Sequence, residues 1–305
     1  MAIHDRSFDE MRGDFAAMWR LLDADFAHRR DDYVWHVSRL GDWKHGLWNE
    51  KKLFPTFFRD YTHLWLDAFD TLLGFVLSEN ADEVFFIVTR PGYDYLYADI
   101  LDWTIRHWMP RFGKLTTEVH EGQQHALAEL ERRGFGTSGV AATTRVYDLS
   151  ATSPAPAELP EGYQIVDMAQ NGDYRAKAVL NLDGFSNRDD LTEFDLLRYA
   201  YSRENPAYDA RLDLSVVTPN GLHVSSCVGF ADPAHGVVEV EKIVTHRQYR
   251  RMGLAEAAVR ECFRRVARMG ITRAYITGYS VEANGLYEKL GPIKYKRWYH
   301  YSLTP

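Results

Sequence analysis

Residues Arg250 to Ala255 have the composition of a phosphate-binding turn between a strand and a helix. The first N–H groups of a helix lack backbone partners and carry partial positive charge, so a helix N-terminus attracts phosphate. Gly253 has no Cβ and lets the backbone approach an anion closely, and Ala255 keeps a nearby position small. The guanidinium groups of Arg250 and Arg251 suit phosphate oxygens. Taken alone, the pattern favours an ordinary loop with solvated arginines.

The elements on either side of this turn can be predicted from hydrophobic periodicity. Residues 237–245 alternate between two sets of side chains, which predicts a strand, and residues 254–269 carry apolar side chains at helical spacing. A second strand is predicted over residues 273–279. The helix that follows it places Asn284 and Tyr287 on one face, because residues three apart are neighbours on a helix surface.

The order and spacing of these features resemble the GNAT superfamily of acyl-CoA-dependent N-acyltransferases. The family motif Arg/Gln-x-x-Gly-x-Gly/Ala matches Arg250, Gly253 and Ala255, and its Asn-x-x-Tyr spacing matches Asn284 and Tyr287. The resemblance is specific over residues 206–291 and weaker in the first half. Within the specific part, the pattern Pro206-x-Tyr208…Leu212-Asp213-Leu214 resembles bacterial tandem-GNAT proteins.

The resemblance implies acetyl-CoA as co-substrate, with its pyrophosphate at the turn and its pantetheine amides along the strand end. A backbone N–H at the strand end could also polarise the thioester carbonyl. Asn284 would orient the cofactor or the helix start, and Tyr287 would protonate the leaving thiolate, although plain core packing is the alternative for Tyr287. The residues implied in cofactor binding are Ile243, Val244, Thr245, Arg250, Arg251, Met252, Gly253, Leu254, Ala255 and Asn284.

An amine acceptor must lose a proton before it can attack, so a general base is expected. Glu239 and Glu241 share one face of the strand that leads to the turn, and Glu241 is nearer its end, where the thioester should lie. We therefore take Glu241 as the preferred base. The alternative is that these carboxylates bind a cationic substrate or pair with Lys242. His246 is a weaker candidate.

The first half of the chain repeats the organisation of the second. The segment Ile87-Val88-Thr89-Arg90 matches Ile243-Val244-Thr245-His246 at an offset of 156 (243 − 87), and Gly134 matches Gly291 at 157 (291 − 134). A nearly constant offset across several elements indicates an internal duplication. We predict an α/β (α+β) fold of two GNAT-like domains in tandem, residues 1–155 and 156–305, each a mixed, mostly antiparallel twisted sheet flanked by helices.

Three further segments complete this organisation. Residues 150–162 contain three prolines and read as an inter-domain linker. A capping box at Ser7 and Glu10 predicts a helix at the start of the chain. The basic and aromatic tail over residues 294–303 is predicted to be the last strand. This strand follows Gly291-Pro292, where the family commonly has Gly-Phe. Because of this departure, the resemblance does not assign the residues that form the wall of the substrate site.

The first copy departs from the motifs of the second. At the duplication offset, Asp94, Tyr97 and Asp99 replace Arg250, Gly253 and Ala255, and Leu127 and Leu130 replace the Asn and Tyr. Carboxylates repel a pyrophosphate, and a tyrosine ring fills the space that a glycine leaves open. We predict that the first copy does not bind CoA in the usual way and instead supports the second copy or shapes its substrate cleft.

The composition narrows the class of protein. Across 305 residues the hydrophobic fraction is 46% and the net charge is −7, which fits a globular protein and argues against general nucleic-acid binding. The sequence contains no run of about 18 apolar residues, so we predict no membrane-spanning helix. Cys227 and Cys262 do not make a disulfide framework and suit a reducing cytoplasm. Neither resembles an acyl-enzyme nucleophile, and the histidines show no metal-ligand pattern.

Two functions from different classes therefore remain. The first is an N-acetyltransferase that uses acetyl-CoA, without a metal, to modify a small-molecule primary amine by direct attack. The second is a non-catalytic sensor or scaffold that binds CoA or another ligand. The acceptor and the oligomeric state stay open, a homodimer being one option.

Overall fold

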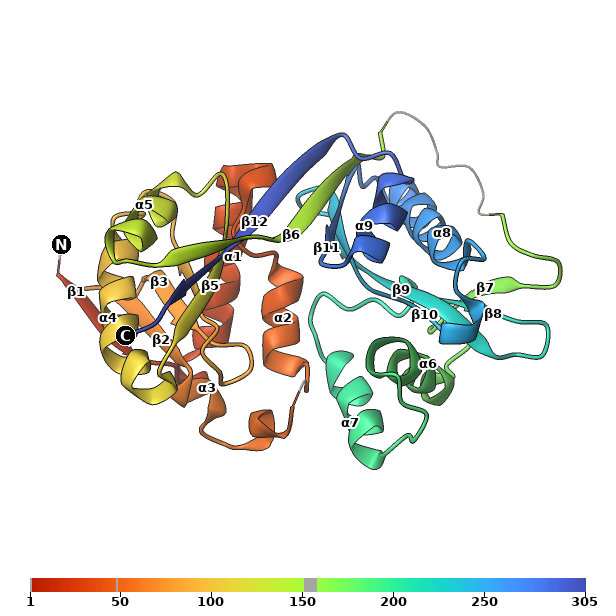
Figure 1. Cartoon of the computed structure of the whole chain (residues 1–305), viewed down its shortest axis with the longest axis horizontal. Helices are drawn as coiled ribbons and strands as arrows, with labels where there is room; N and C mark the ends of the chain where they lie inside the picture. The colour runs from red at the N-terminus through yellow and green to blue at the C-terminus, as the bar shows by residue number, and fades with distance from the viewer. Residues whose placement is uncertain (1, 48, 151–157) are drawn as a thin grey trace. The chain divides into compact units, whose positions relative to one another are not determined.

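The computed structural model describes residues 2–47, 49–150 and 158–305. The chain divides into two compact units. The N-terminal unit comprises residues 1–43, 48–143 and 296–305, and the C-terminal unit comprises residues 44–47 and 144–295 (Figure 1). The predicted domain boundary between residues 155 and 156, and most of the predicted linker, lie outside the described residues.

The N-terminal unit is built on an antiparallel sheet of order β1-β2-β3-β4. The main elements of the first half of the chain end with β6, the strand that leads into the C-terminal unit. They are β1 (Ile3–Ser7), α1 (Asp14–Arg29), α2 (Val37–His45), α3 (Phe57–Asp60), β2 (Thr62–Asp67), β3 (Leu72–Leu77), β4 (Phe86–Thr89), α4 (Leu96–Phe112), β5 (Leu115–His120), α5 (Gln124–Arg132) and β6 (Gly136–Asp148).

The prediction that a helix begins at the Ser7 capping box is wrong, because the first α-helix begins at Asp14. Ser7 ends strand β1, which pairs antiparallel with β2. The Asp9 side chain accepts a hydrogen bond from the Met11 backbone N–H and caps only a short 3-10 turn. Gly13 then adopts a left-handed φ of 76°, and α1 begins after it. Tertiary pairing of the first strand overrides the local capping signal.

The C-terminal unit contains a sheet in which β11, β10, β9, β8 and β7 follow one another. Its elements are β7 (Gln164–Asp167), α6 (Tyr174–Ser186), α7 (Glu193–Ser202), β8 (Asp213–Val217), β9 (His223–Asp232), β10 (Val237–Thr245), α8 (Leu254–Arg268), β11 (Arg273–Gly278) and α9 (Val281–Glu288). The β10–β11 pair is parallel, and the other pairs from β10 to β7 are antiparallel.

Each unit is completed by a strand from the other half of the sequence. Strand β12 (Lys294–Leu303) pairs antiparallel with β5, from Trp298 opposite His120 to Leu303 opposite Leu115, inside the N-terminal unit. Residues 144–148 of β6 belong to the C-terminal unit, where the Val146 carbonyl accepts a 2.8 Å hydrogen bond from the Ile293 N–H. The chain therefore enters the C-terminal unit within β6 and returns to the N-terminal unit within β12.

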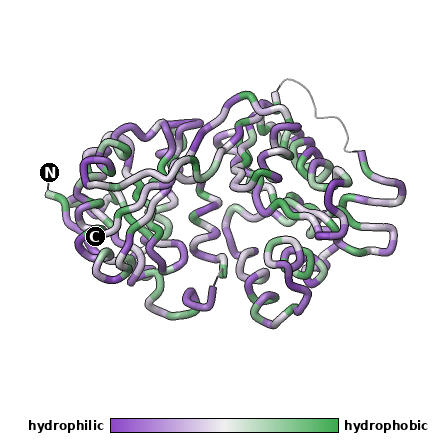
Figure 2. The backbone as a smooth tube through the Cα atoms, viewed as in Figure 1, coloured by the Kyte–Doolittle hydropathy of each residue, from purple (hydrophilic) through white to green (hydrophobic). Residues whose placement is uncertain are grey.

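The apolar side chains gather inside each unit. In the C-terminal unit, α8 packs on β8 to β11 through a core that includes Val238, Val240, Ala258 and Phe263. Two core clusters fill the N-terminal unit, one on the side of α1 and one on the side of α4. Figure 2 shows hydrophobic residues recurring along the strands and helices and hydrophilic residues in the connecting loops. The mixed α/β fold class is confirmed.

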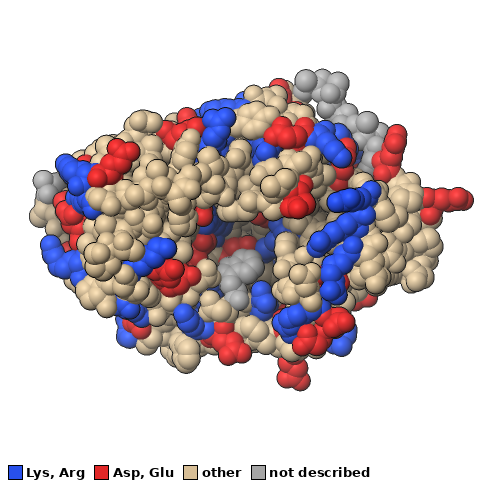
Figure 3. Space-filling model, in the orientation of Figure 1, with Lys and Arg blue, Asp and Glu red and all other residues tan. Residues whose placement is uncertain are grey.

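Charged side chains of both signs are interspersed on the face of the molecule shown in Figure 3. Among the described residues, no helix is both long and apolar enough to cross a membrane.

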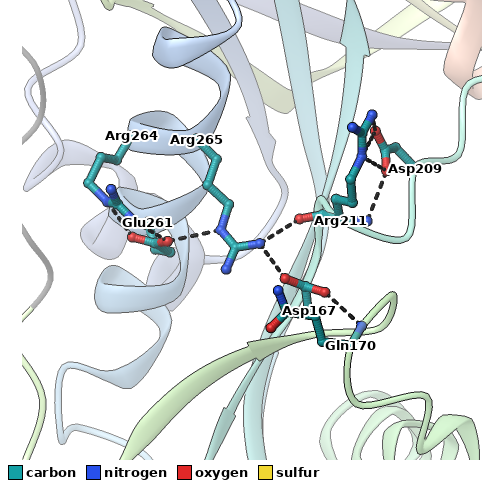
Figure 4. Close-up of polar contacts among 7 residues, drawn as sticks. All are labelled: Asp167, Gln170, Asp209, Arg211, Glu261, Arg264 and Arg265. Carbon is teal, nitrogen blue, oxygen red and sulfur yellow. Dashed lines mark hydrogen bonds and ion pairs between the residues drawn. The ribbon is translucent and has the colours of Figure 1, made fainter.

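A buried carboxylate anchors α8 to the far edge of its sheet (Figure 4). Arg265 donates from Nη1 to Asp167 at 2.6 Å and to the Arg211 carbonyl at 2.8 Å, and from Nε to Glu261 at 2.9 Å. The Asp167 side chain is only 3% exposed. The same guanidinium thus joins α8, β7 and the segment before β8, and it holds the helix whose first turn is described below.

Replacing Arg265 with Met should lower the free energy of unfolding by about 1–3 kcal/mol, because the buried Asp167 carboxylate loses its charged partner. Urea unfolding of the variant and of wild type measures the difference. Arg264→Met is the matched control, since Arg264 bonds Glu261 on the same helix but not Asp167. A loss in the control as large as in Arg265→Met would contradict the anchoring role.

Candidate functional site

The turn predicted to bind phosphate forms the N-terminus of α8. Gly253 is the N-cap residue, with a left-handed φ of 78°, and the helix start has no side-chain cap. Arg251 also has a positive φ, 64°, which is uncommon for a residue with a side chain. A Cβ at Gly253 would meet no atom within 4 Å. The glycine is thus required by backbone conformation, and the N–H groups of the first turn have no capping side chain.

The loop between β10 and α8 is held by a carboxylate from α6. Asp183 is 3% exposed and accepts hydrogen bonds from the Arg247 backbone N–H at 2.8 Å and from Arg247 Nε at 2.7 Å. Burial opposes the charge of Asp183, but the bonds from Arg247 hold its pKa below the usual value. Arg250 leans back toward the same helix, donating weakly to the Gly184 carbonyl at 3.3 Å. No local sequence pattern predicts this anchor.

A close approach of α6 to β10 explains the glycine next to that carboxylate. A Cβ on Gly184 would clash with Val244 Cγ2 and would lie 3.3 Å from the Thr245 carbonyl oxygen. Valine is stiff at χ1, so it cannot easily turn away. The end of β10 is therefore covered by α6 on one face and continues into the α8 turn.

The strand leading to the turn is not regular, and the simple alternation predicted for residues 237–245 is wrong at its end. Glu241 pairs with Val228 and Val244 with Ser226, so two residues of β10 oppose one of β9. Lys242 takes a φ of 54° in this bulge. The extra residue moves Val244 to the face that carries Glu241 and is covered by α6, whereas Val238 and Val240 face the core beneath α8.

The predicted strand-end residues lie around this bulge. Ser225 donates from Oγ to the Val244 carbonyl at 2.9 Å and contacts Thr245 Oγ1 at 2.9 Å. Ile243 packs against the core, and Leu254 is fully buried at the start of α8, while Met252 is exposed. Strands β10 and β11 pair in parallel from Val237 opposite Arg273 to Glu239 opposite Tyr275, so this pairing ends before the bulge.

Tyr287 and Asn284 lie together on α9, as predicted, beside the end of β11. A Cβ on Gly278 would clash with Asn284 Oδ1 and lie 3.1 Å from Tyr287 Cδ2, so this glycine permits the close packing. Tyr287 is 6% exposed. Burial, reinforced by the negative charge of Glu241, raises the pKa of the Tyr287 hydroxyl above its usual value. The charge of Glu241 therefore opposes ionisation of the Tyr287 hydroxyl, and Tyr287 keeps its proton at neutral pH.

A buried polar network joins α6 and α7 to β8 on the face that carries Glu241. Lys177 and Asp213 form an ion pair in which each side chain is 1% exposed. The second oxygen of Asp213 accepts 2.8 Å hydrogen bonds from the hydroxyls of Tyr199 and Tyr208. Tyr208 and Asp213 belong to the sequence pattern noted above, and the network gives that pattern a structural reason.

The corresponding place in the N-terminal unit is occupied by an internal ion pair. Asp94 precedes α4 and contacts Arg29 Nη2 at 2.6 Å, and it accepts a hydrogen bond from Thr89 at 3.2 Å. Tyr97 is 5% exposed inside the first turn of the helix. A pocket of about 200 Å³ remains beside these residues and the start of α5. A carboxylate of the chain itself thus lies near the helix start, and the N-cap residue of α4 is Tyr95 instead of a glycine.

The match to a known protein family lies within the C-terminal unit. Residues 187–291 match the model of the acetyltransferase (GNAT) family. These residues form a GNAT-family domain. The match includes the α8 turn, the β10 bulge and the α9 pair described above, and it confirms the resemblance stated from the sequence. No curated protein matches this sequence.

Solved structures match the chain over nearly its whole length. A GCN5-related N-acetyltransferase from Sphaerobacter thermophilus has a TM-score of 0.64 at 18% identity, covering 99% of this chain and 96% of the other. A tandem GNAT protein from the clavulanic acid biosynthesis pathway has a TM-score of 0.64 at 15% identity, covering 99% and 98%. A GNAT-family acetyltransferase from Colwellia psychrerythraea reaches 0.61 at 11% identity, covering 99% and 100%. The tandem GNAT fold is confirmed.

Proposed function

We propose that this protein is an acyl-CoA-dependent N-acyltransferase that transfers acetyl from acetyl-CoA to the primary amine of a small molecule. The observation that carries the proposal is the uncapped start of α8, with Gly253 in the left-handed conformation, inside the GNAT-family domain. Backbone N–H groups at a helix N-terminus are suited to a pyrophosphate. Arg250 and Arg251 belong to this turn and add positive charge to it.

The two residues at the other end of the site supply the proton transfers. Glu241 takes a proton from the acceptor ammonium, directly or through water, so that the amine nitrogen can attack the thioester carbonyl carbon. The C–S bond then breaks, and Tyr287 gives its proton to the departing thiolate. The surplus proton on the attacking nitrogen restores the tyrosine hydroxyl, directly or through water, which leaves a neutral amide. The Tyr287 hydroxyl is protonated at neutral pH, as this role requires, although burial raises its pKa and makes it a weaker acid than a free tyrosine.

The N-terminal unit has a different role in this proposal. The Asp94–Arg29 pair lies near the start of α4, and the neighbouring pocket of about 200 Å³ is below the usual range of about 300–1,000 Å³ for ligand sites. These features support the view that this unit does not bind CoA in the usual way. The alternative function, a non-catalytic CoA sensor or scaffold, would also use the C-terminal turn but would not need Tyr287.

Acetyl-CoA should raise the melting temperature of the wild type, and Gly253→Asp should abolish this shift. A ligand at 100 times its Kd stabilises the folded state by about 2.7 kcal/mol. An aspartate at the N-cap adds a carboxylate where the pyrophosphate should lie. Thermal unfolding with and without acetyl-CoA measures the shift.

Gly270→Asp is the matched control for backbone strain. Gly270 follows the other end of α8, has a φ of 83°, and also has no atom within 4 Å of an added Cβ. The shift should persist in this variant. No shift in wild type would refute the acyl-CoA proposal, and a shift that survives Gly253→Asp would place the cofactor elsewhere in the chain.

A further inference from the structure

We propose that two residues of β6, Arg145 and Tyr147, are positioning residues for the acetyl transfer, because they hold Asn284 and Tyr287 in place. This inference rests on the proposed function and extends it to a strand that precedes the GNAT-family domain, which begins at residue 187. All four residues belong to the C-terminal unit. A strand of the first half of the sequence thereby completes the site of the second half.

Arg145 fixes the orientation of the Asn284 side chain. Its guanidinium side chain is 6% exposed and donates from Nη1 to Asn284 Oδ1 at 2.8 Å and from Nε to Glu288 at 2.8 Å. Arginine is only a donor, so Asn284 must present its carbonyl oxygen to it and direct its NH₂ group elsewhere. Asn284 and Glu288 are one helical turn apart, so a single guanidinium clamps the turn of α9 that contains Tyr287.

Tyr147 fixes the backbone at Tyr287 itself. Its hydroxyl donates to the Tyr287 carbonyl oxygen at 3.0 Å, close to the end of α9, where backbone carbonyls lack intrahelical partners. The ring of Tyr147 is 2% exposed and lies 5.2 Å from the ring of Phe263 on α8. One side chain therefore links the helix that begins at the phosphate turn to the helix that carries the acid.

The strand that presents these side chains is itself anchored. Thr144 and Thr277 share a 2.8 Å hydrogen bond between hydroxyls, and the Leu149 N–H donates to the Thr272 carbonyl at 2.8 Å. Successive side chains of a strand point to opposite faces, so Arg145 and Tyr147 lie on the same face. Contacts at both ends of this segment hold that face against α9.

Tyr147→Phe should lower kcat about five- to tenfold, because it removes one buried hydrogen bond that orients the acid. Arg145→Met should lower kcat further, by about 10- to 100-fold, since it removes charge-assisted bonds to two residues of α9. Arg145→Lys keeps the charge without the planar fork and should recover only part of the loss. The Kd for acetyl-CoA should change much less than kcat in Tyr147→Phe.

A double-mutant cycle tests whether Tyr147 acts through Tyr287. We would measure kcat and the Kd for acetyl-CoA in Tyr147→Phe, Tyr287→Phe and the double variant, with Tyr163→Phe as a control hydroxyl deletion on the same core. If Tyr147 positions the acid, adding Tyr147→Phe to Tyr287→Phe should lower kcat less than twofold further. Full additivity, or an unchanged kcat in Tyr147→Phe, would overturn the inference.

The outcomes separate this inference from the proposed function. If Tyr287→Phe leaves kcat unchanged, the assignment of the acid fails, and the inference falls with it. If Tyr287→Phe lowers kcat while Tyr147→Phe and Arg145→Met behave like Tyr163→Phe, the proposed function stands and only the role of β6 is refuted.

Discussion

Replacing Tyr287 with Phe should lower kcat by about 10²- to 10⁴-fold while leaving the Kd for acetyl-CoA within about twofold of wild type. The substitution removes only the hydroxyl, and the ring keeps its packing against Gly278. Without the hydroxyl, the thiolate must leave unprotonated or take its proton from water. Steady-state kinetics with an amine acceptor, together with calorimetric titration of acetyl-CoA, measure the two quantities.

Tyr301→Phe is the control for this substitution, because Tyr301 is a buried tyrosine of the N-terminal unit. It should retain the kcat of wild type. A Tyr287→Phe variant with undiminished turnover would exclude this residue as the acid. A wild type that binds acetyl-CoA but transfers acetyl to no amine in a broad collection would favour the sensor or scaffold.

The pH dependence of kcat follows from the environment of the same hydroxyl. Burial and the charge of Glu241 raise the pKa of Tyr287 above its usual value of about 10, so its proton is retained as the pH rises through that value. We expect kcat to rise with pH as the acceptor amine loses its proton, and then to stay level past pH 10 rather than fall. A decline centred near pH 10 in wild type that is absent in Tyr287→Phe would contradict the raised pKa.

Breaking the Lys177–Asp213 pair should produce the largest loss of stability in the C-terminal unit. Asp213→Leu removes the charged partner of the buried Lys177 ammonium, which also donates to the Leu214 carbonyl. It also deprives Tyr199 and Tyr208 of an acceptor. Removing one partner of a buried ion pair costs about 3–5 kcal/mol. Lys177→Met should cost somewhat less, because two tyrosine hydroxyls still donate to Asp213. Urea unfolding at neutral pH measures both variants.

The double variant, Lys177→Met with Asp213→Leu, should be more stable than Asp213→Leu alone, since no unpaired charge is then buried. Arg211→Met is the comparison at an exposed pair, where Arg211 bonds Asp209, and should cost less than about 1 kcal/mol. Strict additivity of the two buried substitutions would show that the charges do not stabilise each other.

The sequence alone locates the turn and the α9 pair because both depend on short-range spacing. Gly253, Asn284 and Tyr287 lie where their patterns place them. The reason for Gly253 differs in part, since the structure shows a left-handed N-cap with open space around it. The bulge in β10 escapes prediction because an extra residue in a strand has no signature when a lysine, and not a glycine, takes the positive φ.

Some residues that support the site could not be predicted, because each acts through a contact with a residue far away in the sequence. These residues are Asp183, Gly184, Arg145 and Tyr147. Arg145 meets Asn284 across 139 positions, and Asp183 meets Arg247 across 64. The predicted linker over residues 150–162 places Arg145 in the first copy. Nothing in the residues around it indicates that the second half of β6 packs on α9.

The crossing of β6 and β12 also affects the order in which the protein can fold during translation. The ribosome makes β5 long before residues 296–303 of β12, its partner strand in the N-terminal unit. Until those residues emerge, the edge of β5 that pairs with β12 stays open to other strands, and such edges invite aggregation. In the C-terminal unit the order is reversed, because residues 144–148 of β6 are synthesised before the other strands of its sheet. The unit that begins first is therefore the one that finishes last.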